Sequence, residues 1–237
     1  MSTEIELFAG TSGFSYKAWK GSFYPAELKD REMLRLYGER LGSVEINSTF
    51  YRMPREEMLA NWREQVPNSF RFVIKAPQRI THRARLKNAG ELVERLWQAM
   101  GGLGDRRGPI LFQLPPNFKA DEELLATFLK TLPSGCEPAL EFRHPSWDST
   151  AVQAILRSHG VALCINDPDD GPTPEIRPTA DWGYLRLRRQ NYGDGELEEW
   201  LGRIQEAGWK RAFVFFKHED EGAAPRLAQR LMALSGL

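Results

Sequence analysis

Residues 138–147, PALEFRHPSW, decide the fold, because they begin as a buried β-strand and yet carry two opposite charges on one side. Side chains alternate between the faces of a strand, so Leu140 and Phe142 share one face while Glu141 and Arg143 share the other. The apolar pair indicates a face that is covered by helices. The charged pair predicts a second face that looks into a polar interior, as on the inside of a β-barrel.

The same kind of strand recurs along the chain. Eight β-rich runs begin at Leu7 (LFAGT), Ser43 (SVEIN), Phe70 (FRFVIKA), Pro109 (PILFQL), Pro138 (PALEF), Val161 (VALCIN), Tyr184 (YLRLR) and Ala212 (AFVFFK). Amphipathic stretches with apolar residues three and four apart lie between them: REMLRLYGERL, EEMLANWREQV, ELVERLWQAM, DEELLATFLKTL, AVQAILRSHG and ELEEWLGRIQEAG. This alternation predicts an α/β protein with a single (β/α)8 TIM-like barrel domain over residues 1–237. A doubly wound open sheet is the alternative.

One connection breaks the alternation. Residues 167–181, DPDDGPTPEIRPTAD, are rich in proline and acidic residues, so they favour a loop over a helix. We therefore predict a degenerate crossover between strands six and seven. The opening GTSGFSYKAW contains neither GxGxxG nor GxxxxGK[ST], so it supports neither a dinucleotide site nor a P-loop.

Composition limits the partners. Lys plus Arg number 32 and Asp plus Glu number 32, so no global field attracts nucleic acid or an acidic membrane. MSTEIELFAG lacks the features of a signal peptide, and no apolar run is long enough to span a bilayer, so we expect a cytoplasmic protein without a membrane partner. Cys136 and Cys164 have no metal-binding spacing, and no motif assigns a cofactor or an oligomeric state.

Polar side chains occupy the inward positions of most predicted strands. Alternation places on the barrel axis Glu45, Asn47, Lys75, Gln113, Glu141, Arg143, Arg186 and Arg188, and Asn166 and Lys217 end strands six and eight. In a (β/α)8 barrel these groups converge at the C-terminal ends of the strands, where active sites form. The alternative is a salt-bridge network that only plugs the barrel.

The predicted ring of charges is unbalanced. Lys75, Arg143, Arg186, Arg188 and Lys217 stand against Glu45 and Glu141. Because guanidinium groups suit phosphates and carboxylates, an anionic small-molecule ligand is the economical inference. The nearby cations would lower the pKa of both carboxyl groups, which argues against a glycosidase acid.

Histidines and aromatic residues follow several strand ends. His82, His144 and His218 permit either proton transfer or a metal site, although no HxH or HExxH spacing is present. His144 directly follows the Glu141 and Arg143 pair and is therefore the best candidate for proton transfer. Rim aromatics suit either stacking on a ligand or packing against the barrel: Tyr16, Trp19, Tyr51, Trp147 and Tyr192.

With these residues in view, the chain resembles the YecE-like family of TIM barrels, a domain of unknown function. The motifs that carry the resemblance are GTSGFSYKAWKGSFYP, VEINSTFYRMP, FRFVIKAPQRITH, GPILFQLPPNF, LEFRHPSW and CINDPD. The resemblance implies a TIM-like barrel with shared polar residues at one mouth, and it implies no reaction. The family pattern falls on Gly10, Ser12, Gly13, Trp19, Glu45, Asn47, Phe50, Tyr51, Lys75, Gln113, Glu141, Arg143, His144, Trp147 and Asp167. The segments RLRRQNY and FFKHEDEG depart from it, so ligand contacts do not transfer to Arg188, Arg189, Lys217 and His218.

Three functions remain open at this point. In the first, an enzyme acts on a phosphorylated or otherwise anionic small molecule. Its catalytic residues are Glu141, His144 and Glu45, with Asn47 beside Glu45 orienting the substrate, and its binding residues are Lys75, Arg143, Asn47, Gln113, Arg186, Trp19, Tyr51, Trp147 and Asp167. The second is a non-catalytic binding or sensing domain for an anionic metabolite or a nucleic-acid end. The third is a metal-dependent hydrolase that uses the loop histidines.

Overall fold

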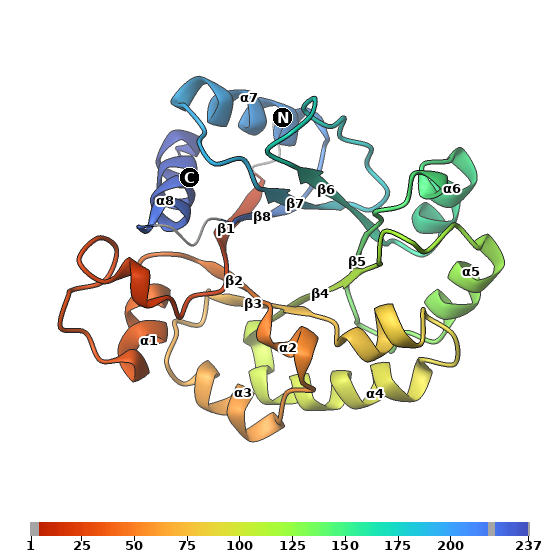
Figure 1. Ribbon diagram of the computed structural model, residues 1–237, viewed down its shortest axis with the longest axis horizontal. Helices are drawn as coiled ribbons and strands as arrows, with labels where there is room; N and C mark the ends of the chain where they lie inside the picture. Colours follow the sequence, from red (N-terminus) through yellow and green to blue (C-terminus); the bar gives the residue numbers. More distant parts are fainter. Residues whose placement is uncertain (1–4, 218–220, 237) are drawn as a thin grey trace.

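Eight parallel strands close into one barrel in sequence order, as the computed structural model of residues 5–217 and 221–236 shows (Figure 1). The strands are β1 (Glu6–Ser12), β2 (Ser43–Ile46), β3 (Arg71–Lys75), β4 (Arg107–Gln113), β5 (Pro138–Glu141), β6 (Ala162–Asp167), β7 (Trp182–Leu187) and β8 (Arg211–Phe216). β1 pairs with both β2 and β8, so the sheet has no open edge. The predicted (β/α)8 barrel is confirmed, and the open sheet is excluded.

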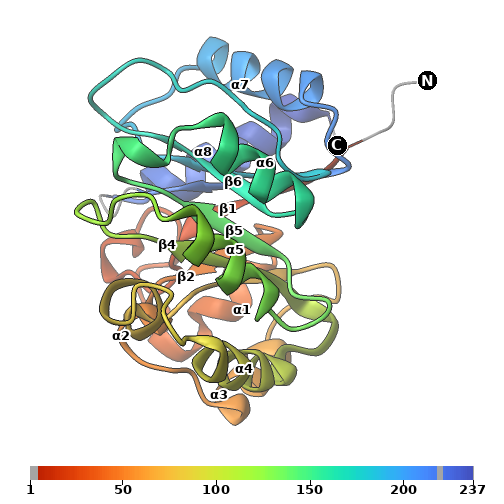
Figure 2. The ribbon, with the colours of Figure 1, turned by 90° about the vertical axis from the view of Figure 1, so that its right-hand side faces the viewer.

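Helices surround the barrel on its outside (Figure 2). They are α1 (Met33–Gly38), α2 (Ser48–Tyr51), α3 (Glu56–Arg63), α4 (Gly90–Ala99), α5 (Glu122–Lys130), α6 (Thr150–Ser158), α7 (Asp194–Glu206) and α8 (Ala223–Ser235). Each of the six predicted amphipathic stretches overlaps one of them. The sequence analysis missed two helices, the four-residue α2 and α8, although the buried Ala224, Ala228 and Leu231 of α8 have helical spacing.

The crossover from β6 to β7 contains no helix among its residues, all of which the structure describes. The degenerate crossover is thereby confirmed. Thr179 holds the end of this loop against β6: its hydroxyl accepts from the Leu163 amide at 2.9 Å and donates to the Val161 carbonyl at 2.7 Å. These bonds replace part of the anchoring that a packed helix would provide.

Two apolar cores lie on the two sides of the sheet. The larger fills the space between strands and helices, and the smaller fills the N-terminal half of the barrel interior. In the smaller core the rings of Phe8 and Phe213 stack with centroids 4.8 Å apart, and Trp182 meets Phe213 edge to face. Apolar side chains therefore close the bottom of the barrel, and the polar groups occupy the part near the C-terminal ends of the strands.

Candidate functional site at the C-terminal mouth of the barrel

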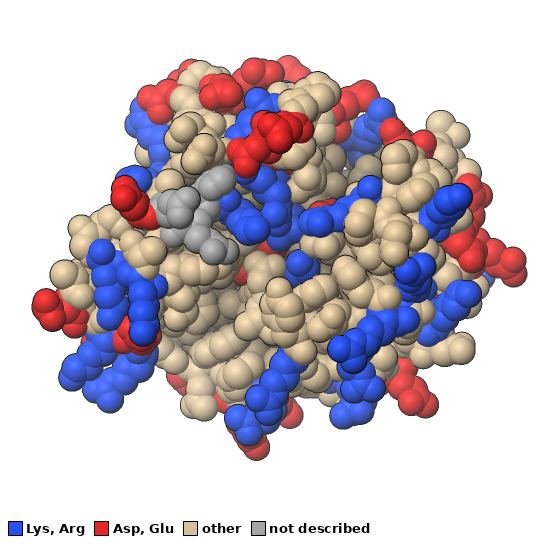
Figure 3. Space-filling view, in the orientation of Figure 1, with Lys and Arg blue, Asp and Glu red and all other residues tan. Residues whose placement is uncertain are grey.

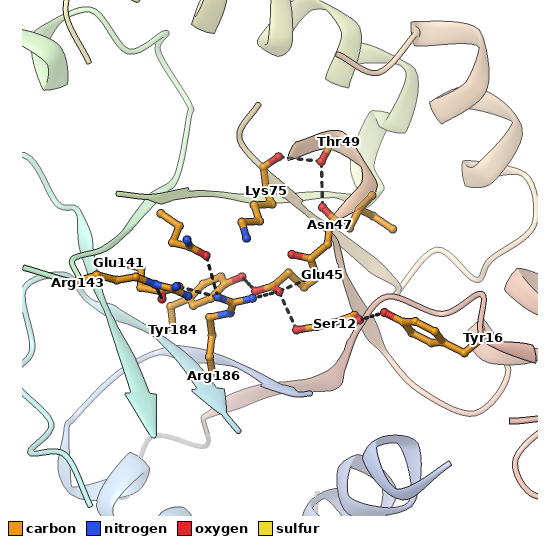
Figure 4. A network of polar contacts seen from close by, with 12 residues as sticks. Ser12, Tyr16, Glu45, Asn47, Thr49, Lys75, Glu141, Arg143, Tyr184 and Arg186 are labelled. Carbon is orange, nitrogen blue, oxygen red and sulfur yellow. Dashed lines mark hydrogen bonds and ion pairs between the residues drawn. The ribbon is translucent and has the colours of Figure 1, made fainter. Parts of the chain in front are cut away.

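Arg186 is the centre of a buried charged layer above the small core (Figure 4). Its Nη2 donates to Glu45 Oε1 at 2.7 Å, and its Nη1 donates to Glu141 Oε2 at 2.6 Å. Glu45, Glu141 and Arg186 are 0%, 1% and 1% exposed, so all three charges are withdrawn from water. A buried guanidinium between two carboxylates fixes the position of each partner.

Further donors reach the oxygens of both carboxylates. Glu45 accepts from the Ser12 hydroxyl at 2.8 Å, the Asn47 amide at 3.1 Å and the Tyr184 hydroxyl at 2.6 Å. Glu141 accepts from Arg143 Nε at 3.0 Å. Every carboxylate oxygen of the charged layer therefore accepts at least one hydrogen bond, and the layer joins strands β1, β2, β5 and β7, while Arg186 Nε is buried without a hydrogen-bond partner.

Strand register explains why these partners meet. Ser12 lies opposite Glu45 across β1 and β2, and Gln113 lies opposite Glu141 across β4 and β5. Tyr184 and Arg186 are two residues apart on β7, so both point inward, and their heads reach Glu45 from opposite sides of its carboxylate. Sequence reasoning gave Tyr184 no role, although its spacing from Arg186 is the signal that places it inside.

The network holds both glutamates in the ionised state. Burial alone would raise the pKa of Glu45, but the Arg186 guanidinium and the Tyr184 hydroxyl outweigh it and lower that pKa to about 2. For Glu141, burial is likewise opposed by Arg186 and Arg143, and the pKa is lowered. Burial would lower the pKa of Arg186, whereas the two carboxylates raise it. All three groups therefore stay charged at neutral pH.

A pocket of about 490 Å³ lies directly above this layer and opens to solvent at the mouth of the barrel. Its lining residues are Ser12, Tyr16, Asn47, Ser48, Phe50, Tyr51, Lys75, His82, Gln113, Arg143, Arg186, Arg188 and Lys217. Five of these are Lys or Arg, and among the described residues no Asp or Glu lines the walls. Figure 3 shows basic side chains gathered around the hollow at the centre of this face.

The charges around the pocket are mainly positive. Five cations in the walls and two carboxylates beneath them leave an excess of three positive charges, whereas the whole chain is neutral. Burial and the neighbouring Arg186 lower the pKa of Arg188. Positive charges at this density repel one another, so an anion in the pocket would relieve the repulsion.

Two other groups in the pocket walls, Lys75 and His82, have pKa values below their ordinary values. Burial, followed by repulsion from Arg186, lowers the pKa of Lys75 from 10.5 to about 8. Burial and the charges of Lys75 and Arg143 lower the pKa of His82. Lys75 Nζ lies 4.5 Å from the centroid of the Phe50 ring, and the His82 ring packs edge-on against the same ring.

The structure brings only part of the predicted site together. Lys75, Asn47, Gln113, Arg143, Arg186 and Tyr51 line the pocket, and the Tyr51 side chain is 76% exposed at its entrance. Glu45 and Glu141 lie in the layer beneath, with their oxygens bound to other side chains. Arg188 and Lys217 also line the pocket, whereas His218 lies outside the described residues.

The two predicted tryptophans lie away from the pocket walls. Trp19 is fully buried behind Tyr16 and packs on Phe23, and Trp147 stacks on Phe142 and donates its Nε1 to the Phe118 carbonyl at 2.7 Å. Both rings pack the outer side of the barrel rim, which corrects the expectation that they face the ligand. Packing was the alternative for each of them.

Asp167 also points away from the axis. It follows the inward Asn166 on β6, so alternation turns it outward, where it is bound by the Tyr192 hydroxyl at 2.8 Å and Arg189 Nε at 3.1 Å. This position corrects the expectation that Asp167 contacts the substrate, because its carboxylate instead anchors the loop after β7. The inward position of Asn166 is the signal in the sequence for this outward orientation.

His144 lies on the other side of β5 from the basic pocket. Its Nδ1 accepts from the Ser146 amide at 3.1 Å and caps the short turn Pro145–Trp147, and the residue lines a separate cavity between β5, β6 and α6. The expectation that it follows Glu141 into the site is thus corrected, because the backbone turns outward after Arg143. His82 is the described histidine in the pocket walls.

Two absences in the described part of the chain bear on function. Within residues 5–217 and 221–236, no group of three or more His, Cys, Asp or Glu side chains is arranged to hold a metal ion. The same residues include no helix with the length and hydropathy needed to cross a membrane.

Comparison with known proteins supplies the family. Residues 8–237 match the family described as "Protein of unknown function DUF72". This chain belongs to the DUF72 family. The resemblance to YecE-like barrels is confirmed by YecE of Escherichia coli K12, which is 36% identical over 154 residues. That match spans 62% of this chain and 56% of the YecE sequence, a little over half of its length.

Other relatives cover most of the chain. YunF of Bacillus subtilis is 22% identical over 254 residues, which span 90% of each chain. The crystal structure of a DUF72 protein from Thermotoga maritima superposes with a TM-score of 0.83 at 28% identity, and it covers 98% of this chain and 100% of its own. The TIM-like barrel of this DUF72 chain is therefore shared across nearly its full length.

Proposed function

We propose that this DUF72 protein is an enzyme that acts on a phosphorylated or otherwise anionic small molecule in the basic pocket. The observation that carries the proposal is the composition of the pocket walls: five Lys and Arg side chains and no described carboxylate. A volume of about 490 Å³ suits a small molecule. The oxygens of a phosphate or carboxylate match the guanidinium geometry of Arg143 and Arg188, whereas the guanidinium of Arg186 already donates to Glu45 and Glu141.

The buried layer suggests separate roles for its members. Glu45 and Glu141 are ionised, buried and fully bound, so we assign them to positioning Arg186 and Arg143. His82 replaces His144 as the candidate for proton transfer, because it lines the pocket and its lowered pKa leaves the imidazole neutral at neutral pH. Asn47 and Gln113 offer neutral hydrogen bonds beside the cations.

A binding or sensing domain for an anionic metabolite is the second candidate. It is favoured by one observation: the two acidic groups nearest the pocket are held as carboxylates by Arg186 and Arg143, which leaves them no proton to donate. The observation that His82 and His144 lie in different cavities argues against a metal-dependent hydrolase that uses both histidines.

Inorganic phosphate is expected to stabilise the protein in a saturable way. Binding to the folded state alone contributes about 2.7 kcal/mol at a hundredfold excess over the dissociation constant, which corresponds to roughly 5–10 °C in Tm for a chain of this size. The measurement is a thermal unfolding series in phosphate against chloride of equal ionic strength. The Arg143→Met variant is expected to lose the saturable part, because one of the anion's guanidinium partners is removed.

Arg35→Met is the matched control, since Arg35 pairs with Glu39 on the exposed face of α1. It is expected to shift with phosphate as the wild type does. The general salting-in or salting-out effect of phosphate acts equally on all three proteins and does not saturate. Equal saturable shifts in the wild type and Arg143→Met contradict the anion site.

Turnover separates the two candidate functions. Phosphorylated metabolites that stabilise the wild type are incubated with it, and their consumption is followed by mass spectrometry. Loss of a compound with the wild type but not with His82→Gln supports the enzyme. Saturable binding of every such compound without any conversion supports the binding domain instead.

A further inference from the structure

Lys75 stands out in the pocket walls because its charge is not matched by a partner. No hydrogen bond or ion pair joins its Nζ to any residue that the structure describes, and this atom lies 4.5 Å from the centroid of the Phe50 ring. Figure 4 shows the side chain pointing toward the charged layer, with dashed lines only at its backbone carbonyl. Its amine therefore faces the pocket without being held by an acid.

The nearby acids are already occupied. Every oxygen of Glu45 and Glu141 accepts a bond from Arg186, Arg143, Ser12, Asn47 or Tyr184. The other groups that act on Lys75 are the cations Arg186 and Arg188, and the imidazole of His82 lies in the same pocket. An ammonium in this setting is penalised both by burial and by like charge.

Lysine differs from arginine at such a position. A guanidinium keeps its proton, whereas the amine of Lys75, with a pKa of about 8, is unprotonated in a large fraction of molecules at mildly alkaline pH. Arg143 and Arg188 already supply permanent cations in the pocket walls. A desolvated lysine beside other cations is a good nucleophile toward carbonyl carbon.

We infer that Lys75 forms an imine with the carbonyl group of an anionic aldehyde or ketone held by the pocket arginines. The amine nitrogen bonds to the carbonyl carbon, and one of its protons passes to the carbonyl oxygen to give a carbinolamine. This intermediate takes up one further proton, loses its hydroxyl as water and becomes the protonated imine. His82 is placed in the same pocket to relay that proton from solvent.

The inference rests on the proposed function, because the arginines must hold the anionic group while the carbonyl meets Lys75. It adds the substrate class, an anionic carbonyl compound, and the covalent step. It also gives Lys75 a catalytic role where the sequence suggested only electrostatic binding.

Pyridoxal 5′-phosphate serves as the probe, because it carries an aldehyde and a phosphate on one small ring. Borohydride supplies the hydride that reduces the C=N bond and fixes the adduct, and peptide mass spectrometry then locates it. At pH 8 the initial labelling rate of Lys75 is expected to exceed that of the exposed Lys210 by on the order of a hundredfold. The reason is the larger neutral fraction of an amine whose pKa is lowered from 10.5 to about 8.

Three comparisons sharpen the test. Pyridoxal without the phosphate is expected to label Lys75 about tenfold more slowly, and inorganic phosphate is expected to slow the phosphorylated probe. The labelling rate of Lys75 is expected to rise through a midpoint near pH 8.

Lys75→Arg keeps the positive charge and is expected to lose the imine absorbance while retaining stabilisation by phosphate. Lys210→Arg is expected to leave both unchanged.

The outcomes separate the two proposals. If phosphate stabilises the wild type and competes with the probe, but Lys75 reacts no faster than Lys210, the imine is overturned and the anion site stands. If phosphate gives no saturable stabilisation and both aldehydes label Lys75 equally, the anion site is overturned together with the anionic substrate class. A labelling midpoint near that of an ordinary lysine also overturns the imine.

Discussion

Replacing Arg186 with methionine is expected to lower the free energy of unfolding at pH 7 by about 3–5 kcal/mol, because it leaves two buried carboxylates without their shared guanidinium. Methionine keeps much of the side-chain volume, so the loss reports charge rather than a cavity. Glu45 retains hydrogen bonds from Ser12, Asn47 and Tyr184, and Glu141 retains Arg143, but none of the three donors to Glu45 is charged. Urea unfolding followed by tryptophan fluorescence measures the change.

The pH dependence gives this prediction a second readout. In the wild type the folded pKa of Glu45 is about 2, below its ordinary value of 4.5, so its contribution to stability is complete above pH 4.5 and is lost as pH falls toward 2. Without Arg186, burial dominates and raises the folded pKa above 4.5. The variant is therefore expected to gain stability as pH falls from 7 to 5, while the wild type shows little gain from this group.

Two further proteins test the explanation. Arg230→Met removes an arginine from an exposed pair with Asp194 on the outside of the barrel, and little change is expected there. Adding Glu45→Gln and Glu141→Gln to Arg186→Met removes the unpaired charges and is expected to restore part of the lost stability. A variant as stable as the wild type at pH 7, or one that shows no gain at pH 5, would contradict the buried-charge account.

Gly10→Ala is expected to prevent normal closure of the barrel. A Cβ on Gly10 would lie 1.9 Å from the carbonyl oxygen of Ser43, its register partner on β2, and 3.1 Å from the Tyr37 hydroxyl. Tyr37 donates to that same Ser43 carbonyl at 2.9 Å and accepts from the Thr11 amide at 2.9 Å, so neither neighbour is able to yield easily. We expect a loss of about 4 kcal/mol or more, the range reached by backbone clashes in a closed structure.

Gly42→Ala is the matched control, since it lies directly before Ser43 and its added Cβ would meet nothing within 4 Å. Its backbone does not need glycine, so the substitution is expected to be neutral or to stabilise by up to about 1 kcal/mol through the unfolded chain. Chemical denaturation and far-UV circular dichroism compare the two. Similar stabilities for both variants would show that β1 and β2 tolerate separation at Gly10.

Alternation along the strands predicted the inner face of the barrel well. Lys75, Gln113 and Arg186 lie inside, as the apolar partners at Ile74, Phe112 and Leu185 indicated, because a residue that packs on helices forces its neighbours toward the axis. The prolines of residues 168–178 likewise predicted the missing helix. These features depend on local spacing, which a single sequence contains.

Depth within the barrel was not predictable in the same way. Glu45 and Glu141 share the inner face with Lys75, yet they lie in the layer below the pocket, because depth depends on the stagger between strands that are far apart in the sequence. The orientation of loop side chains was not predictable for another reason. No periodicity governs the segments that hold Trp19, Trp147 and His144, so a position just after a strand end does not show whether a side chain faces the pocket.

The three residues of the charged layer are made at very different times during synthesis. Glu45 is 141 residues ahead of Arg186, and Glu141 is 45 residues ahead. A nascent chain that ends before β7 holds two acids destined for the interior while their counterion is still untranslated. Any partial barrel that enclosed them would bury unpaired charge, so it is disfavoured until Arg186 arrives. Closure of the barrel around the charged layer is therefore favourable only after seven of the eight strands have been synthesised.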